Sequence, residues 1–503
     1  MNARENFRPF TDPEEFERII EKDTVTEMWR DCLSDYADRE AIVFRDTACT
    51  YEELERDAAA FRAVLLLQQI DGGRVGILCA NSYDFVKAFI AVTTLGMTAV
   101  ILPAHLDARS VFGCCMRFQL DALVYQPELD SQLDIVREKL DDLPIIDITA
   151  ETLDSAEMRD CDAKTPCVMM FTGGTTGKSK CALLSNGAVM QGTVNGCYGV
   201  WNVFHQRYLL ILPLSHVFGL IRNLMTALYT GSTLLICDNN KNMFRDIKSF
   251  KPTVLVMVPA LAEMSLSLSK QFGRNMLGDD LKTIICGAAA VAPYLIEEYD
   301  KLGIKLLQGY GLTESANLVS GNPLSVEHPD SIGYPYPNQE LKIVDGELWL
   351  RGKNMMDGYV GGDENGFDEE GWFHTGDLVR QDESGLLYIT GRIKEIIVLS
   401  NGENISPAEL EGHFNALPFI QDSQVFETVT DGGRHILALE VVPRQTVLAK
   451  LPVENPKRFI IGELEKVNQS LPSFQRVTRI TVRDSDFARS PSMKIVRYKN
   501  DKK

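Results

Sequence analysis

The chain has 503 residues, of which 45% are hydrophobic and 24% charged, and its formal net charge is −19. This length exceeds what one hydrophobic core sustains, so at least two domains are expected, with the composition of an ordinary globular protein. The negative charge argues against a nucleic-acid partner or an anionic membrane surface, because both select for Lys and Arg.

The eleven cysteines lie scattered between Cys32 and Cys286 without a Cys-x-x-Cys pair. This pattern indicates reduced thiols and a cytoplasmic location rather than a disulfide framework or a zinc site. Residues 1–26 are charged throughout and lack the apolar core of a signal peptide. The longest apolar runs, such as 89–102, are interrupted and too short for a transmembrane segment.

Apolar strands that alternate with amphipathic helices predict an α/β fold with a doubly wound, mostly parallel sheet. In the first third, helices are expected at 23–36, after the capping box Thr50-x-x-Glu53, at 85–95 and at 111–118, and strands at 41–44, 75–78, 98–102 and 122–125. Further strands are expected at 167–171, 209–213, 254–258 and 281–286.

The sequence pattern changes at residue 331. Short strands, at 340–344 and 347–350, alternate there with Gly, Asp and Asn turns, which predicts a small, mostly antiparallel β subdomain. Beyond it, a strand at 386–390, a helix at 408–414, strands at 425–428 and 436–442 and a helix at 459–471 predict a small α/β domain.

The strand at 167–171 runs into a loop of small and basic residues, Thr172-Gly173-Gly174-Thr175-Thr176-Gly177-Lys178-Ser179-Lys180. The loop can be a solvated turn or a phosphate site, because Gly lets backbone N–H groups face an anion, hydroxyls donate hydrogen bonds and Lys adds charge. A Walker P-loop is excluded by spacing, since it needs Gly five residues before Gly177, where Thr172 stands.

Two later segments carry groups suited to a nucleotide. The first is Gln308-Gly309-Tyr310-Gly311-Leu312-Thr313-Glu314, with a ring for a purine, a hydroxyl for a phosphate and a carboxylate for a hard cation. It is not a dinucleotide fingerprint, because Glu314 replaces the third Gly. The second is Trp372-Phe373-His374-Thr375-Gly376-Asp377, whose carboxylate can accept hydrogen bonds from both ribose hydroxyls.

In this order, the segments resemble the motifs of the adenylate-forming (AMP-binding) superfamily, above all its acyl-CoA synthetases. The loop resembles the superfamily's phosphate loop, with Gly173, Ser179 and Cys181 in place of Ser, Pro and Gly. Residues 310–314 and 372–377 match the motifs Tyr-Gly-x-Thr-Glu and Trp-x-x-Thr-Gly-Asp without a departure, and the resemblance extends from Tyr51 to Arg497.

The resemblance implies a role for each matching residue. Tyr310 would stack on adenine, Thr313 would hold the α-phosphate, Glu314 would ligate Mg²⁺ and Lys180 would add charge beside the phosphates. The full set expected to bind ATP is Thr172, Gly173, Gly174, Thr175, Thr176, Gly177, Gly287, Ala288, Ala289, Gln308, Gly309, Tyr310, Gly311, Thr313, Asp377, Ile389 and Arg392.

Some of these positions have a structural alternative. The small residues 287–289 would let a purine approach the backbone, or they would serve close helix–strand packing. His216, in Pro213-Leu214-x-His216-x-x-Gly219, would border the acyl pocket by resemblance, whereas a lone histidine near a strand end is otherwise structural.

The C-terminal part resembles the mobile half of the superfamily. Lys394 occupies the position of the hinge between the domains, and the loop with Gly402 and Glu403 matches the Gly-Glu-Asn-Ile-x-Pro loop that meets coenzyme A in CoA ligases. Residues 488–497 resemble Pro-x-Thr-x-x-Gly-Lys-x-x-Arg; Met493 replaces the Gly, and Lys494 retains the catalytic Lys.

These observations predict an N-terminal domain at 1–391, with α/β layers at 1–165 and 166–325 and the β subdomain at 326–391, followed by a mobile lid domain at 392–503. The expected reaction joins a carboxylic acid to AMP from MgATP, releases pyrophosphate and transfers the acyl group to coenzyme A. Lys494, Lys180 and the metal would neutralise charge, because attack of one anion on another needs charge and positioning more than a base.

Three alternatives stay open. The first is an adenylation enzyme that loads a non-amino acid onto the phosphopantetheine of an acyl carrier protein; residues 216–223 contain no acid to hold an ammonium group, which argues against an amino acid. The second is a luciferase-like oxygenase, which no feature of the sequence supports specifically. The third is a non-catalytic binding homologue, against which Glu314, Asp377, Arg392 and Lys494 argue.

Arg222 stands in a nearly apolar stretch, 217–228, that is expected to form a helix beside the acyl pocket. In one interpretation its guanidinium reaches solvent or a carbonyl group. In the other it pairs with a second carboxylate or polar group of the substrate, because an unpaired buried Arg is costly. The rest of the expected pocket wall, at 216–224, at 287–290 and after Ser315, is mostly apolar and small, which suits a fatty or aryl acid.

Overall fold

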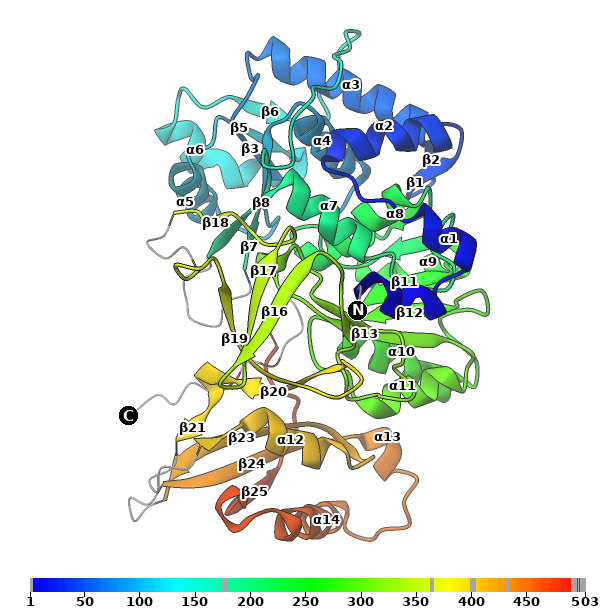
Figure 1. The fold of residues 1–503 in the computed structure, drawn as a ribbon, viewed down its shortest axis with the longest axis vertical. Coiled ribbons are helices and arrows are strands. Elements are labelled where there is room, and N and C mark those ends of the chain that lie inside the picture. Colours follow the sequence, from blue (N-terminus) through cyan, green and yellow to red (C-terminus); the bar gives the residue numbers. More distant parts are fainter. Residues whose placement is uncertain are drawn as a thin grey trace.

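The computed structural model describes residues 3–172, 180–361, 366–398, 404–430, 435–489, 495 and 497. Two large sheets form the N-terminal part, and smaller sheets follow (Figure 1). The seven-stranded sheet has the order β18-β8-β7-β4-β3-β5-β6, with β3 (Arg74–Leu78), β4 (Thr98–Leu102), β5 (Ala122–Tyr125), β6 (Ile145–Asp147), β7 (Pro166–Phe171), β8 (Cys181–Ser185) and β18 (Gly358–Tyr359).

The nine-stranded sheet has the order β15-β14-β13-β12-β11-β9-β10-β1-β2. Six adjacent strands, from β13 to β1, run parallel, and the others are antiparallel to their neighbours. Its strands are β1 (Glu40–Phe44), β2 (Thr47–Thr50), β9 (Arg207–Leu210), β10 (Thr233–Ile236), β11 (Val254–Met257), β12 (Thr283–Cys286), β13 (Lys305–Tyr310), β14 (Ser320–Asn322) and β15 (Tyr334–Pro335).

Helices pack around these sheets and bury their central strands. Every residue of β4, β10, β11 and β12 is buried, as expected of parallel strands covered on both faces. The N-terminal helices are α1 (Pro13–Arg18), α2 (Val25–Tyr36), α3 (Tyr51–Leu67), α4 (Tyr83–Thr94), α5 (Ala108–Phe118), α6 (Asp134–Lys139), α7 (Asn186–Asn195), α8 (Thr226–Tyr229), α9 (Met243–Phe250), α10 (Pro259–Phe272) and α11 (Pro293–Asp300).

Short helical segments complete this part: the 3-10 helices η1 (Ala3–Phe10), η2 (Pro127–Leu133), η4 (Asn240–Asn242) and η5 (Thr313–Ser315), and the π-helix η3 (Phe218–Met225). The predicted elements of the first third are present, and the capping box is confirmed: the Thr50 hydroxyl accepts the Glu53 amide at 3.1 Å, and the Glu53 carboxylate accepts the Thr50 amide at 2.9 Å.

The two large sheets do not divide the chain in sequence order. Strands β1 and β2 belong to the nine-stranded sheet although they precede every strand of the other sheet, and β7, β8 and β18 belong to the seven-stranded sheet. The expected division into layers at residue 165 therefore does not follow the sheets. Periodicity identifies a strand, whereas its partners are chosen by packing between distant segments.

An antiparallel sheet confirms the predicted β subdomain. Its order is β16-β17-β19-β20, with β16 (Gln339–Val344), β17 (Glu347–Gly352), β19 (Phe373–Gln381) and β20 (Leu387–Arg392). The 3-10 helix η6 (Ile393–Glu395) and the two-stranded sheet β21 (Ile397–Val398) and β22 (Asn404–Ile405) follow it.

The C-terminal part has its own apolar cluster around a three-stranded sheet. Its elements are β23 (Ile420–Val429), β24 (His435–Pro443), β25 (Arg479–Val482), α12 (Pro407–Asn415), α13 (Gln445–Leu448), α14 (Pro456–Ser470) and the 3-10 helix η7 (Ser473–Gln475). Figure 1 shows it at the end of the molecule opposite α2 and α3. The predicted boundary at 391–392 remains a proposal; it falls at the end of β20.

A few polar contacts join the C-terminal part to the rest. Arg444 forms an ion pair with Glu263 on α10 (3.0 Å), and its guanidinium lies 3.9 Å from the ring centre of Tyr294. The Ser406 hydroxyl donates to the Thr390 carbonyl at 2.7 Å. Such contacts orient the C-terminal part relative to the N-terminal part, while each part keeps its own apolar core. Separately, each helix among the described residues is too short or too polar to cross a membrane.

Candidate active site

A cavity of about 2070 Å³ lies where the two parts of the chain meet. Its floor is formed at the carboxyl ends of parallel strands of the nine-stranded sheet, by Ile211 after β9, Val258 after β11, Gly287 after β12 and Tyr310 at the end of β13. Residues 392–397 and 424–427 close it from the other side. Ligands of open α/β sheets bind at this edge, so the cavity is the candidate active site.

The cavity collects positive charge in an acidic protein. Its described lining holds six Lys or Arg residues against four Glu residues, although the chain as a whole carries −19. The cations are Arg117, Lys180, Arg222, Arg392, Lys394 and Arg497, and the acids are Glu314, Glu347, Glu395 and Glu427. This local excess favours a polyanionic ligand in a chain whose net field repels one.

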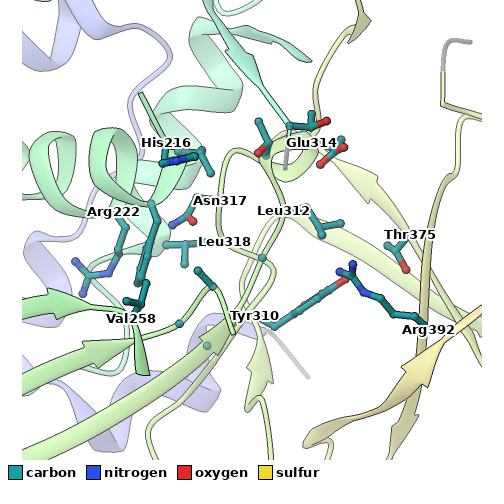
Figure 2. Close-up of a pocket in the computed structure, with 18 of the residues that line it drawn as sticks. His216, Arg222, Val258, Tyr310, Leu312, Glu314, Asn317, Leu318, Thr375 and Arg392 are labelled. Atoms are coloured by element: carbon teal, nitrogen blue, oxygen red, sulfur yellow. The ribbon is translucent and has the colours of Figure 1, made fainter. Parts of the chain in front are cut away.

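Tyr310 and Arg392 line the cavity, and the buried Asp377, which is not itself part of the described lining, joins them into one cluster. The Tyr310 hydroxyl donates to Asp377 Oδ2, and Arg392 Nε lies 2.6 Å from Asp377 Oδ1; register pairs Asp377 on β19 with Arg392 on β20. Burial and the adjacent carboxylate raise the pKa of Tyr310 well above its usual value, so the phenol stays a donor. Figure 2 shows the Arg392 guanidinium at the hydroxyl end of Tyr310.

Burial, the largest single effect, lowers the pKa of Arg392, but Asp377, Tyr310 and Glu395 together outweigh it, and the pKa ends above its usual value. Asp377 is only 1% exposed. A carboxylate can accept about four hydrogen bonds, and Tyr310 and Arg392 use two of these acceptor directions. The cluster can therefore present a fixed negative charge beside an aromatic ring.

Glu314 lies in a second cluster with Lys180 and Tyr359. The Tyr359 hydroxyl donates to Glu314 Oε1 at 2.7 Å, and the Lys180 Nζ lies 4.5 Å from the centre of the Tyr359 ring. These residues come from η5, β18 and the end of the loop that joins β7 to β8, where the Thr172 amide bonds the Lys180 carbonyl at 2.9 Å. The hairpin thus brings Lys180 onto the ring of Tyr359, the residue that bonds the Glu314 carboxylate.

Among the described residues, no group of three or more His, Cys, Asp or Glu side chains could hold a metal ion alone. One carboxylate is nevertheless enough for Mg²⁺ when a nucleotide supplies phosphate oxygens and water completes the shell. Glu314 has a second carboxylate oxygen for which no hydrogen bond is seen among the described residues, so the site fits a metal that arrives with its nucleotide.

Close backbone packing explains several of the small residues. A Cβ on Gly311 would lie 1.3 Å from the Asn317 carbonyl oxygen, so only Gly fits there. Gly287 lines the cavity beside Ala288, which adopts a positive φ of 67°, whereas the described cavity lining does not include Ala289. The Gln308 amide donates to the Pro329 carbonyl at 2.7 Å.

His216 precedes the π-helix η3, and its carbonyl accepts the amides of Gly219 and Leu220 at 3.0 and 2.9 Å. His216 lines the cavity, as does Thr313. Figure 2 places His216 and Glu314 on the upper edge of the cavity and Tyr310 below them. π-Helical turns are rare and recur at functional sites, which fits this position.

The segment after β20 connects the cavity to the C-terminal part. Lys394 lies in η6 and is exposed, while Glu395 pairs with Arg497 at 2.9 Å. Arg497 also makes two bonds of 2.7 Å to the Glu411 carboxylate on α12. Burial raises the pKa of Glu411 although Arg497 opposes this effect. These ion pairs hold Arg497, which stands three positions after the predicted catalytic Lys494 in the sequence.

Several predicted residues are not placed in the site. Some of them lie outside the described residues: Gly173, Gly174, Thr175, Thr176 and Gly177 of the phosphate loop, Gly402 and Glu403 of the loop expected to meet coenzyme A, and Lys494. Ile389 is 42% exposed and is absent from the described lining of the cavity.

Sequence reasoning missed Tyr359, which stands outside every motif, and it did not single out Asn317, whose place in the wall depends on the turn after Glu314. The final Arg of the C-terminal motif already pointed to Arg497.

Comparison with known proteins agrees with this geometry. A family model described as AMP-binding enzyme matches residues 29–360, and one described as AMP-binding enzyme C-terminal domain matches residues 394–503. Indoleacetate–CoA ligase of Aromatoleum aromaticum is 29% identical over 459 residues, which cover 82% of this chain and 88% of the relative. 2-Succinylbenzoate–CoA ligase of Enterococcus faecalis is 24% identical over 489 residues, covering 92% and 95%.

Among solved structures, the anthranilate CoA ligase AuaEII in complex with anthranoyl-AMP has a TM-score of 0.81 at 20% identity, covering 94% of this chain and 95% of that one. Structural similarity at this sequence identity supports the fold alone. The matches to the two family models span most of the sequence, and on that basis the chain belongs to the AMP-binding enzyme family of the adenylate-forming superfamily.

Proposed function

We propose that the protein is an AMP-forming acyl-CoA synthetase that activates a carboxylic acid with ATP and passes the acyl group to coenzyme A. The observation that carries the proposal is the cavity between the two parts, which combines an excess of cations with the Tyr310–Asp377–Arg392 cluster. Relatives that are named CoA ligases support the thiol acceptor.

The nucleotide would bind across the two clusters. Tyr310 would stack on adenine, and Asp377 beside its hydroxyl would accept hydrogen bonds from the ribose, using the acceptor directions that Tyr310 and Arg392 leave. Lys180 and Thr313 would face the phosphates, and Glu314 would hold Mg²⁺, which supplies Lewis-acid neutralisation of the phosphate oxygens. The loop 173–179 would complete the phosphate contacts.

In the first half-reaction, a carboxylate oxygen of the acid attacks the α-phosphorus, an acyl–O–P bond forms, and the bond to the pyrophosphate oxygen breaks. Lys494 would stabilise the charge that develops, while the cavity wall orients the acid for in-line attack. In the second half-reaction, the thiol sulfur attacks the acyl carbon, AMP leaves with the bonding electron pair, and the thiol proton passes to water.

One lid would serve both half-reactions. Rotation about Lys394 would withdraw Lys494 and bring the loop with Gly402 and Glu403 to the acyl adenylate. This rotation would break the few polar contacts between the parts, such as the partly buried ion pair of Arg444 with Glu263.

A panel of carboxylic acids tests the proposal. Purified protein is mixed with MgATP and each acid, and pyrophosphate release and AMP formation are measured with coenzyme A, with a phosphopantetheinylated carrier protein, or without a thiol. We expect pyrophosphate with at least one acid and AMP formation that depends on coenzyme A. AMP formation only with the carrier protein would establish the carrier-loading alternative, and nucleotide binding without pyrophosphate from any acid would establish a non-catalytic homologue.

A further inference from the structure

Arg222 lies in the π-helix at the edge of the cavity. The residue is 2% exposed, and its side chain lines the cavity. Figure 2 shows it on the side away from Arg392 and Thr375, with Asn317 and Leu318 nearer to it than the nucleotide cluster is. Gly196, at the C-terminal end of α7, leaves room for its stem, since a Cβ there would lie 3.1 Å from Arg222 Cδ. The aliphatic stem of Arg222 is therefore closely packed.

No described carboxylate pairs with this cation. Among the residues that the structure describes, Arg222 has no ion pair, and its Nη1 is buried without a hydrogen-bond acceptor. The titratable groups it influences are Tyr208, Tyr336 and Cys197. The Tyr208 hydroxyl is a hydrogen-bond partner of Arg222, but burial raises the pKa of Tyr208, so this partner is neutral. Burial raises the pKa of Tyr336 to about 12 and that of Cys197 to about 12, so neither supplies a negative charge at neutral pH.

One further acid acts on this region, but it is engaged elsewhere. Glu15 influences Tyr208 and Cys197, and its Oε2 accepts the backbone amide of Val203. A second donor in the cavity wall is also unsatisfied: Asn317 Nδ2 is buried and has no acceptor among the described residues. Two donors without acceptors in one cavity indicate a ligand that carries the acceptor.

The rest of this end of the cavity is apolar. Its wall includes Tyr198, Val200, Phe218, Val258, Leu318 and Tyr336. A buried cation without a counter-charge destabilises a fold strongly, and an apolar residue of similar volume would fill the place better. A carboxylate binds the guanidinium of Arg with two parallel hydrogen bonds and also neutralises its charge, whereas a neutral group does not neutralise it.

We propose that the acid activated here carries a second carboxylate at its far end, and that Arg222 binds this carboxylate while the first one meets the α-phosphate. The inference rests on the proposed function and specifies its substrate class. Arg222 acts as a specificity residue: it binds the substrate away from the reacting atoms, and it has no part in nucleotide binding.

The test compares α,ω-dicarboxylic acids from glutarate to sebacate with the monocarboxylic acids of the same chain lengths. Pyrophosphate release gives kcat/KM for wild type, Arg222→Met, Arg222→Lys and the control Arg274→Met, which removes an exposed charge outside the cavity. For the best dicarboxylic acid, we expect Arg222→Met to lower kcat/KM about 10- to 100-fold, as for loss of a hydrogen-bonded charge pair. Monocarboxylic acids should keep their rates, and Arg222→Lys should recover part of the loss.

Thermal unfolding accompanies these assays. Because Arg222→Met removes a buried charge without a described partner, we expect a Tm equal to or above that of wild type. If wild type prefers the monocarboxylic acid at every chain length, or if Arg222→Met leaves the ranking of acids unchanged, the proposal is wrong. If Arg222→Met does not fold, the wild-type ranking and the Arg222→Lys variant decide in the same way.

Failure of the proposed function gives a different result. No acid would then release pyrophosphate, and calorimetric titration of the same proteins with the same acids replaces the kinetic assay. Tighter binding of a dicarboxylic acid by wild type, lost in Arg222→Met, would still support the anion site. Equal binding by both proteins, or none by wild type, would overturn it.

Discussion

Replacement of Asp377 by Asn removes one charge from the Tyr310–Asp377–Arg392 cluster and keeps its shape. The Asn carbonyl can accept from Arg392 Nε, and the Asn amide can donate to the Tyr310 hydroxyl, which rotates to accept. The lost Coulomb attraction is screened because the Arg392 side chain is 44% exposed. We therefore expect a loss of about 1 kcal/mol in the free energy of unfolding.

Nucleotide affinity should fall by more than stability does. Two ribose hydroxyls that donate to a carboxylate would then meet one carbonyl oxygen and one amide donor. Loss of one hydrogen bond to a charged group is worth about 2 kcal/mol, which is roughly 30-fold in the dissociation constant for ATP. Isothermal calorimetry with ATP measures the affinity, and urea unfolding measures the stability.

Asp382 offers a matched control in the same β subdomain. Its carboxylate also accepts a tyrosine hydroxyl, from Tyr388 at 3.0 Å, but Tyr388 is not part of the described cavity lining, whereas Tyr310 and Arg392, the partners of Asp377, are. Asp382→Asn should cost stability and leave ATP affinity unchanged. If Asp377→Asn binds ATP within twofold of wild type, Asp377 only holds the two strands together and the ribose assignment is wrong.

Three further outcomes are expected. Lys494→Ala should slow pyrophosphate release by about 3–4 kcal/mol in activation free energy but largely spare thioester formation from a supplied acyl adenylate; equal loss in both assays would contradict the lid mechanism. Tyr359→Phe frees Glu314 Oε1 from its 2.7 Å hydrogen bond and should change the Mg²⁺ concentration needed for ATP binding roughly 3- to 10-fold, as seen by calorimetry at several Mg²⁺ concentrations. An unchanged Mg²⁺ requirement in Tyr359→Phe would mean that Glu314 does not hold the metal. Lys270 and Lys301 lower the pKa of Glu298, so its contribution of at most about 1 kcal/mol should be present above the ordinary Glu value of 4.5 and vanish as pH falls through the lowered pKa. The unfolding free energies of wild type and Glu298→Gln should converge in that range; a constant difference would exclude this linkage.

The sequence by itself determined the local structure and the chemistry at its motifs. Hydrophobic periodicity located β3, β4 and α3, and the capping box at Thr50 marked a helix start, because these signals depend on neighbours along the chain. The motif residues Tyr310 and Asp377 were likewise visible, since each carries a group that suits one part of a nucleotide. The order of the motifs pointed to the family.

Only the tertiary structure decided which segments meet. Strands β1 and β2 join a sheet whose other strands begin at residue 207, and Tyr359 reaches Glu314 from 45 residues away in sequence. The sequence left Arg222 with two interpretations, and the fold buries it in the cavity without a described counter-charge. Burial and partners are sums over distant residues, so no local pattern encodes them, whereas a strand or a cap is fixed within one short segment.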